Sequence, residues 1–210
     1  MNVLAMDTAT PAPSIAVLSG ERIFDETLSG DRRASEELLP AVGRALARAG
    51  LRLADIERVA VCSGPGSFTG IRVGLATAWG FGRALGVDVE AVPTLEAMAE
   101  GARPFGADRA VVALDAGRGE VVAECFDLTS PRARSLGASR RTTPDGVSAI
   151  ANGDPIVALP RELVPAAFGA PLPAVAASLA LAVARDPRPA TALEAIYSRP
   201  SAAEEKHGAL

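Results

Sequence analysis

Short apolar runs and longer amphipathic stretches alternate along the first half of the chain. Brief apolar runs bounded by Gly, Pro, Ser or Thr are typical of buried strands. Stretches in which apolar residues recur every three to four positions are typical of helices. The pattern predicts strands over 3–7, 14–18, 22–28, 56–62 and 87–92, and helices over 35–49, 67–85 and 94–102.

The two longer predicted helices carry different kinds of side chains. The helix over 35–49 has an apolar stripe that consists of Leu38, Leu39, Val42 and Leu46. The helix over 67–85 has small residues at every fourth position, and residues four apart lie on one helix face. One row consists of Gly70, Gly74, Ala78 and Gly82, and a second row of Ala76, Gly80 and Ala84.

The second half of the chain partly repeats the beginning of the first. An apolar run over 110–115 ends on Asp115, much as the first strand ends on Asp7, and a Gly-rich turn and a return strand over 120–128 follow. This repetition predicts an α/β protein with two related lobes, over 1–102 and 103–200. The stretch 130–173 has no clear period, 174–184 is helix-like, and 201–210 is a polar tail that we expect to be mobile.

The composition limits the classes of function. The 210 residues include 21 basic and 25 acidic side chains, which gives a net charge of -4, and 49% of the residues are hydrophobic. These values are typical of an ordered globular protein, whereas a chain that binds a nucleic-acid backbone by itself is usually basic. We therefore expect any contact with nucleic acid to be made by a partner. No leader or membrane-length apolar run is visible, so a cytoplasmic protein is expected.

The few cysteine and histidine residues exclude several kinds of site. Cys62 and Cys125 both lie in apolar, strand-like runs and are expected to be free thiols. His207 is the single histidine and lies in the polar tail. A zinc site with several histidines or a HExxH pair is therefore excluded, and we predict no metal site.

The first strand ends in an acidic turn (7–10) that resembles a phosphate-binding element. Asp7, Thr8 and Thr10 supply hydroxyls and a carboxylate that can hold Mg²⁺ through water, next to backbone N–H groups. The alternative is an ordinary hairpin, in which Asp and Thr side chains bond their own backbone. Spacing alone leaves both interpretations open.

A glycine loop (64–67) joins the strand over 56–62 to the next helix and is a second candidate for an anion site. Gly64, Gly66 and Ser67 precede a helix N-terminus, where free N–H groups and the helix dipole attract negative charge. The lysine of a Walker loop is absent, and Pro65 removes one N–H donor. A tight connection without a ligand is the alternative, and spacing does not decide between the two.

The rows of small residues in the helix over 67–85 also permit two interpretations. A row can pack on the sheet of its own chain, or it can dock another helix. Because the helix has two such rows, one can meet the sheet while the other meets a different helix. Together with the helix over 35–49 it would then present an apolar patch, and such a patch on a monomer marks an interface.

Several segments together resemble the TsaB (YeaZ) family. The most specific is the stretch 63–74, with the sequence SGPGSFTGIRVG. The others follow in the order found in the family and lie at 6–10, 35–40, 93–97, 115–120 and 197–200. These matches cover most of the first 120 residues, whereas the middle of the second half matches loosely.

The resemblance implies an actin-like ATPase fold (ASKHA, ribonuclease H-like) with two related lobes. It further implies a non-catalytic scaffold subunit in the bacterial machinery that makes N6-threonylcarbamoyladenosine (t6A) at adenosine 37 of tRNA. In that family the protein pairs with the catalytic paralogue TsaD, the ATPase TsaE joins them, and tRNA is reached only through the complex. The chain alone then requires no cofactor, ATP and Mg²⁺ belong to the level of the complex, and no membrane is involved.

The helices over 35–49 and 67–85 correspond to those that form a helical bundle with TsaD in the family. The resemblance therefore favours docking as the role of the first row of small residues, with a homodimer through the same helices as a further expectation. The expected partner interface consists of Leu38, Leu39, Val42, Leu46, Gly70, Gly74, Ala78 and Gly82. Many relatives have His where this chain has Ala34, which supports a scaffold without metal chemistry.

The rival hypothesis is a stand-alone ATP-binding phosphotransferase or ATPase of the actin-like fold. It would use the acidic turn and the glycine loop to hold nucleotide phosphates. Turnover of ATP by the isolated chain that is lost in Asp7→Ala would favour it. A metallopeptidase is not supported, because the chain lacks the ligands that such an enzyme needs.

Overall fold

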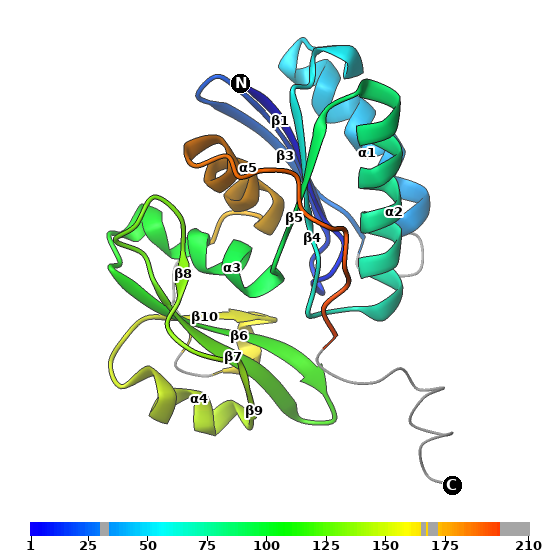
Figure 1. Cartoon of the computed structure of the whole chain (residues 1–210). Coiled ribbons are helices and arrows are strands. Elements are labelled where there is room, and N and C mark those ends of the chain that lie inside the picture. The colour runs from blue at the N-terminus through cyan, green and yellow to red at the C-terminus, as the bar shows by residue number, and fades with distance from the viewer. Residues whose placement is uncertain (30–33, 165–166, 168–171, 198–210) are drawn as a thin grey trace, which may run out of the picture.

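Two β-sheets lie in two lobes, and helices pack between them (Figure 1). The computed structural model describes residues 1–29, 34–164, 167 and 172–197. The first sheet has the strand order β3-β2-β1-β4-β5, and the second has the order β10-β6-β7-β8, with β9 also paired to β7. The α/β class with two lobes agrees with the expectation from the sequence.

The first sheet is centred on β1 (Asn2–Asp7). This strand pairs antiparallel with β2 (Ser14–Ser19) and parallel with β4 (Arg58–Cys62). β3 (Arg22–Thr27) and β5 (Asp88–Val92) form the two edges. Because helices cover both faces of the sheet, the apolar residues of β1 are wholly buried, as a continuous apolar run predicts.

The helices of the first lobe lie on opposite faces of this sheet. Figure 1 shows α1 (Ala34–Ala49) and α2 (Phe68–Leu85) together on one face and α5 (Val175–Arg185) on the other. α1 packs on β2 and β3, and α2 packs on β4 and β5. Ser67 caps α2, since its hydroxyl accepts a hydrogen bond from the N–H of Gly70, and the helix ends before a glycine in the left-handed conformation.

The second sheet repeats the centre of the first. β6 (Arg109–Gly117) pairs antiparallel with β7 (Glu120–Asp127) and parallel with β10 (Ile156–Leu159), as β1 pairs with β2 and β4. α4 (Pro144–Ala151) packs on β6 and β7 and precedes β10, much as α1 precedes β4. The duplicated unit predicted from the sequence is confirmed. The short strands β8 (Arg134–Ser135) and β9 (Arg140–Thr142) pair with the outer side of β7.

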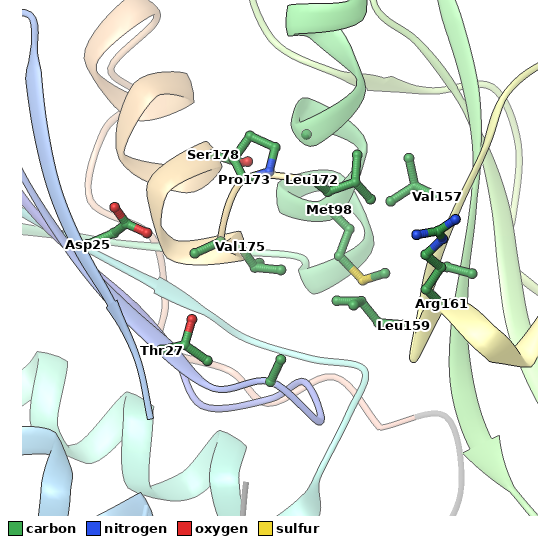
Figure 2. Close-up of a pocket in the computed structure, with 14 residues that line it drawn as sticks. Asp25, Thr27, Met98, Val157, Leu159, Arg161, Leu172, Pro173, Val175 and Ser178 are labelled. Carbon is green, nitrogen blue, oxygen red and sulfur yellow. The ribbon is translucent and has the colours of Figure 1, made fainter. Parts of the chain in front are cut away.

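The connection between the lobes runs through α3 (Thr94–Ala99) and the 3-10 helix η2 (Glu100–Phe105). α3 contacts β6 of the second lobe and α5 of the first. A cavity opens beside this connection, between the edge strand β3 on one side and β10 on the other (Figure 2). Two further single-turn 3-10 helices, η1 (Leu53–Asp55) and η3 (Arg161–Leu163), lie in loops.

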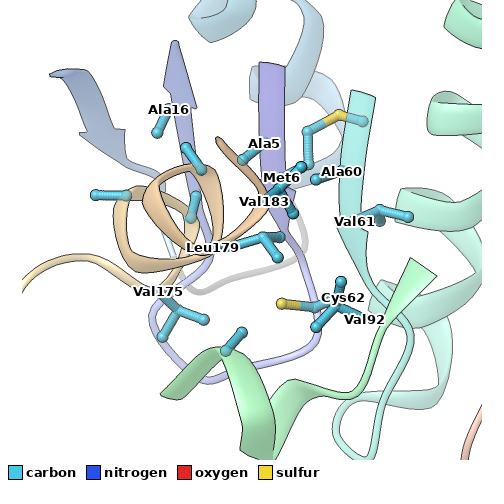
Figure 3. Close-up of a cluster of buried hydrophobic side chains, with 14 of the residues drawn as sticks. Ala5, Met6, Ala16, Ala60, Val61, Cys62, Val92, Val175, Leu179 and Val183 are labelled. Atoms are coloured by element: carbon cyan, nitrogen blue, oxygen red, sulfur yellow. The ribbon is translucent and has the colours of Figure 1, made fainter. Parts of the chain in front are cut away.

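The last helix returns to the first lobe. Val175, Leu179 and Val183 lie four residues apart and form a row that packs against β1, β2 and β4 (Figure 3). The stretch after α5 then runs along β5, where the N–H of Ala91 donates to the hydroxyl of Thr191 over 2.8 Å. The sequence-based division assigned 103–200 to one lobe, and the packing differs from it, because α5 completes the core of the first sheet. The expected mobile tail, 201–210, lies outside the described residues.

A buried group of charges holds the second lobe against the first. Arg132, in the loop between β7 and β8, is 2% exposed and forms an ion pair with Glu90 of β5, which is 1% exposed. Its Nε lies 3.3 Å from a carboxylate oxygen of Glu96 on α3, without the geometry of a hydrogen bond. Buried charges are tolerated only when they are paired, so the position of this loop is tied to β5 and α3.

Both cysteines are free, with Cys62 wholly buried and Cys125 partly buried. Burial, reinforced by the nearby carboxylate of Asp7, raises the pKa of the Cys62 thiol well above its usual value. Within the described ranges no helix has both the length and the apolar character needed to cross a membrane.

Candidate functional site

The acidic turn is stabilised by hydrogen bonds to the carboxylate of its own Asp7. One oxygen of Asp7 accepts hydrogen bonds from the N–H groups of Ala9, at 2.9 Å, and Thr10, at 3.2 Å. The other oxygen accepts the hydroxyl proton of Thr10. Burial raises the pKa of Asp7 from 3.8 to about 6, and these hydrogen bonds partly oppose that rise. Both carboxylate oxygens are therefore occupied within the turn, as in the ordinary hairpin interpretation.

The third residue of the turn fixes the start of α2. The hydroxyl of Thr8 donates a hydrogen bond to the carbonyl oxygen of Gly70 over 2.7 Å. A Cβ atom on Gly70 would lie 1.8 Å from the carbonyl oxygen of Thr8, so only glycine fits there. The hydroxyl that was a candidate for phosphate binding is thus a packing contact between β1 and α2.

The glycine loop packs on the acidic turn. The N–H of Ser67 donates to the carbonyl oxygen of Ala9 over 2.8 Å, and a Cβ on Gly66 would lie 2.2 Å from that oxygen. The N–H of Gly64 donates to the hydroxyl of Thr94 over 3.0 Å. The two candidate phosphate elements are brought together, as the rival hypothesis requires, but they contact each other directly, and the N–H of Ser67 is used in that contact.

This arrangement does not suit a nucleotide held by the chain alone. A phosphate cradle needs free N–H groups and a space for the anion, and a Mg²⁺ site needs carboxylate oxygens that face it. Here the donors of Ala9, Thr10, Gly64 and Ser67 are engaged within the protein. Across the part of the chain that is described, no group of three or more His, Cys, Asp or Glu side chains is placed to hold a metal ion.

The chain beyond α5 closes the same region from the other side. The N–H of Ile196 donates to the carbonyl oxygen of Ser63 over 2.7 Å, and a Cβ on Gly64 would lie 2.0 Å from the carbonyl oxygen of Ile196. Gly64 also has a φ of +106°, which disfavours any other residue. The glycines at 64 and 66 are therefore explained by close backbone contacts within the chain.

An exposed cluster of two rings and a guanidinium stands next to this loop. The ring of Tyr197 lies 4.8 Å from that of Phe68, and the guanidinium of Arg72 lies 3.7 Å above the Phe68 ring. The Nε of Arg72 donates to the hydroxyl of Tyr197 over 3.2 Å. In the sequence Tyr197 is recognisable only as part of the motif 197–200, and no sequence pattern predicts its contact with Phe68. The rest of that motif and His207 lie outside the described residues.

Most residues of the expected partner interface are buried within the chain itself, whereas the prediction placed them on a docking surface. On α1 the buried residues are Leu38, Val42 and Leu46; on α2 they are Gly74, Ala78 and Gly82. A Cβ on Gly74 would lie 2.3 Å from the hydroxyl of Thr8, and one on Gly82 would lie 2.3 Å from a methyl group of Val89. With Gly70 against Thr8, the first small-residue row lets α2 lie close to its own sheet, which was the alternative interpretation of the row.

A different set of residues faces outward from the same two helices. Leu39 is 59% exposed on α1, and Trp79 is 60% exposed on α2. Nothing lies within 4 Å of the place where a Cβ of Gly43 or Gly80 would stand. Ala76 and Ala84, which share the second small-residue row with Gly80, are also exposed. We call the residues Leu39, Gly43, Ala76, Trp79, Gly80 and Ala84 the outer face.

Solved structures that resemble the chain include "YeaZ from Pseudomonas aeruginosa". The two share 30% sequence identity with a TM-score of 0.75, and the match covers 93% of this chain and 99% of that one. This similarity over the whole chain confirms the actin-like fold with two lobes that the sequence analysis expected.

Sequence comparisons point in the same direction. The chain is 34% identical over 202 residues to an uncharacterized protein of Mycobacterium tuberculosis, a match over 92% of this chain and 84% of the relative. It is 39% identical over 122 residues to the tRNA threonylcarbamoyladenosine biosynthesis protein TsaB of Escherichia coli, over 58% of this chain and 53% of TsaB. A family model described as "TsaD: tRNA N6-adenosine threonylcarbamoyltransferase" matches residues 28–130.

Proposed function

The chain belongs to the TsaB (YeaZ) family, and on this premise we propose that it acts in t6A formation on tRNA as a non-catalytic subunit that binds TsaD. The observation that carries the proposal is the outer face of α1 and α2. A leucine and a tryptophan are each more than half exposed there, between glycines that leave open space. Large apolar side chains in water are typical of a surface that a partner covers.

The chemistry of this face suits other helices as partners. Burial of Trp79 and Leu39 would remove apolar surface from water at about 25 cal/mol per Å². The missing side chains at Gly43 and Gly80 allow the axis of a facing helix to come near. We therefore assign the contact with TsaD to Leu39 and the second small-residue row, in place of the first row and the buried apolar stripe. In the absence of TsaD the same face would form a homodimer.

Two features support a role without catalysis by this chain. The N–H groups of Ala9, Thr10, Gly64 and Ser67 are engaged in hydrogen bonds within the chain, so neither the acidic turn nor the glycine loop is poised to hold a phosphate. The sequence has a single histidine, which is too few for a metal site built from several histidines. The chain then needs no cofactor of its own, and ATP with Mg²⁺ acts in the complex with TsaD and TsaE. The net charge of -4 agrees with contact with tRNA through the partners only.

The proposal is tested by co-elution of the chain with TsaD and by the t6A content of tRNA made by the reconstituted proteins. Trp79→Glu and Gly80→Arg place a charge on the outer face without filling a buried space, so both variants should fold and lose TsaD. Leu136→Glu is the matched control, because Leu136 is an exposed leucine of the second lobe, 42% exposed. It should bind TsaD as the unaltered chain does.

Two results would overturn the proposal. Normal TsaD binding by both outer-face variants would show that the interface lies elsewhere. ATP hydrolysis by the isolated chain that disappears in Asp7→Ala would favour the rival phosphotransferase or ATPase.

A further inference from the structure

The cavity between the two lobes has the size of a small-molecule site. Its volume is about 370 Å³, and ligand pockets for small molecules commonly begin at about 300 Å³. It is lined by residues of both lobes, with Thr27 at the end of β3 on one side and Leu159 at the end of β10 on the other. Figure 2 shows these residues around a common space, and none of the residues of the acidic turn or the glycine loop is among those that line it.

The middle of the cavity is apolar. Met98 of α3 and Val175 of α5 lie between its two sides, next to Leu159 and Leu172 (Figure 2). Ser178 adds a single hydroxyl and is 3% exposed. Among the described residues this hydroxyl makes no hydrogen bond, and its oxygen is accessible from the cavity. A hydroxyl that faces a cavity is one of the few polar groups by which an apolar site can orient a ligand.

Opposite charges stand at the two sides of this apolar middle. Asp25 projects from β3 of the first lobe, and Arg161 projects from η3 of the second, with Val175 and Met98 between them (Figure 2). Within the described part of the chain, neither side chain forms an ion pair or a hydrogen bond. Most other carboxylates and guanidiniums between the lobes are paired, as in the group around Arg132.

We propose that this cavity binds a small zwitterion whose ammonium and carboxylate groups are separated by an apolar body, such as a short apolar peptide. The ammonium pairs with Asp25, the carboxylate pairs with Arg161, and the body covers Met98 and Val175. Because the two charged residues belong to different lobes, the ligand bridges them and stabilises their relative position. The proposal uses none of the residues of the outer face and does not depend on TsaD.

The test uses three probes that share an apolar chain: ω-aminooctanoic acid, octanoic acid and octylamine. Calorimetric titration of the full chain at low salt should give saturable one-to-one binding of the zwitterion, with a dissociation constant of about 1 mM or below. The two probes with one charge should bind about tenfold more weakly, because each lacks one charge-assisted contact. Bound zwitterion should also raise the temperature of thermal unfolding.

Three variants assign the contacts. Arg161→Gln should weaken binding of the zwitterion and of octanoic acid about tenfold and leave octylamine unchanged, and Asp25→Asn should do the reverse. Gly101→Leu should abolish binding of all three probes, because the leucine side chain would fill the cavity. A Cβ at this lining position would lie 3.6 Å from its nearest atom, the hydroxyl oxygen of Ser178, so the substitution causes no clash there. Arg140→Gln, which alters an exposed arginine of β9, is the control and should change nothing.

The proposal is wrong if no probe binds saturably to the unaltered, folded chain. It is also wrong if the zwitterion binds no better than the two single-charge probes, or if the cavity variants leave its affinity unchanged. Each of these three results leaves the proposed scaffold function intact, because that function is measured by TsaD binding with variants of α1 and α2.

Discussion

The hydroxyl of Thr8 donates a hydrogen bond to the carbonyl oxygen of Gly70, and 2.7 Å separate the two oxygens. This contact joins the end of β1 to the first turn of α2, and the next small residue of the row, Gly74, lies against the same threonine. The helix therefore lies as close to the sheet as its backbone allows. The first small-residue row is a feature of the core, and the outer face is formed by the other side of α2.

Alanine at positions 74 and 80 of α2 should have opposite effects on stability. In Gly74→Ala the new methyl group would stand 2.3 Å from the hydroxyl oxygen of Thr8, so we expect overpacking to lower the free energy of unfolding by about 1–3 kcal/mol. In Gly80→Ala the methyl group meets open space. The better helix propensity of alanine should then raise the free energy of unfolding by about 0.5–1 kcal/mol. Urea unfolding of both variants measures the two changes. Equal effects would contradict the assignment of the two rows.

Asp7 should make the stability of the chain fall as pH rises from about 4 to about 6. Burial raises its pKa from 3.8 to about 6, so the folded chain binds the proton more tightly than the unfolded chain. This favourable difference is present below the unfolded pKa and is lost as pH rises through the folded pKa. A shift of this size corresponds to about 3 kcal/mol.

The variant Asp7→Asn isolates this contribution. Its amide oxygen can still accept hydrogen bonds from the turn, but the side chain does not ionise. Relative to the unaltered chain, the variant should gain about 2 kcal/mol of unfolding free energy between pH 4 and pH 7. Unfolding curves at a series of pH values give the difference. Parallel pH profiles of the two proteins would show that Asp7 ionises normally in the folded state.

Substitutions of the neighbours Leu38 and Leu39 should have different effects, the first on stability and the second on TsaD binding. Leu38 is 1% exposed, so Leu38→Ala leaves a cavity and should cost about 2–5 kcal/mol of unfolding free energy. Leu39 is 59% exposed, and Leu39→Ala should change stability by less than about 0.5 kcal/mol. Under the proposed function, Leu39→Ala should still weaken the co-elution with TsaD. Unimpaired TsaD binding by Leu39→Ala would remove this residue from the outer face.

Substitution of the buried Arg132 should lower the free energy of unfolding strongly. Arg132→Met leaves the buried carboxylate of Glu90 without its main partner, and loss of one member of a buried ion pair costs about 3–5 kcal/mol. The double variant Arg132→Met with Glu90→Gln should recover part of this loss, because no uncompensated charge is left. A double-mutant cycle in urea measures the coupling. Additive effects would mean that the two side chains do not stabilise one another.

Sequence patterns predicted the elements of the first lobe closely. The helices expected over 35–49 and 67–85 are found at Ala34–Ala49 and Phe68–Leu85, and the five expected strands are all present. These elements are long enough for their apolar periods to be read. Between 130 and 173 the elements are too short for that, since β8 has two residues and β9 has three, and they depend on pairing with β7. That part of the fold was not predicted.

By itself the sequence determined which residues are small, apolar or acidic and at what spacing, and hence the α/β class, the repeated lobe and the family resemblance. It did not determine which of the two small-residue rows of α2 faces the sheet, because both rows consist of small residues and either one suits a close contact. The tertiary structure decided this by placing Thr8, Val61 and Val89 under Gly74 and Gly82. It likewise decided that the glycine loop packs on the acidic turn through the hydrogen bond from the N–H of Ser67 to the carbonyl oxygen of Ala9, since contacts between segments distant in sequence are set by the sheet that aligns them.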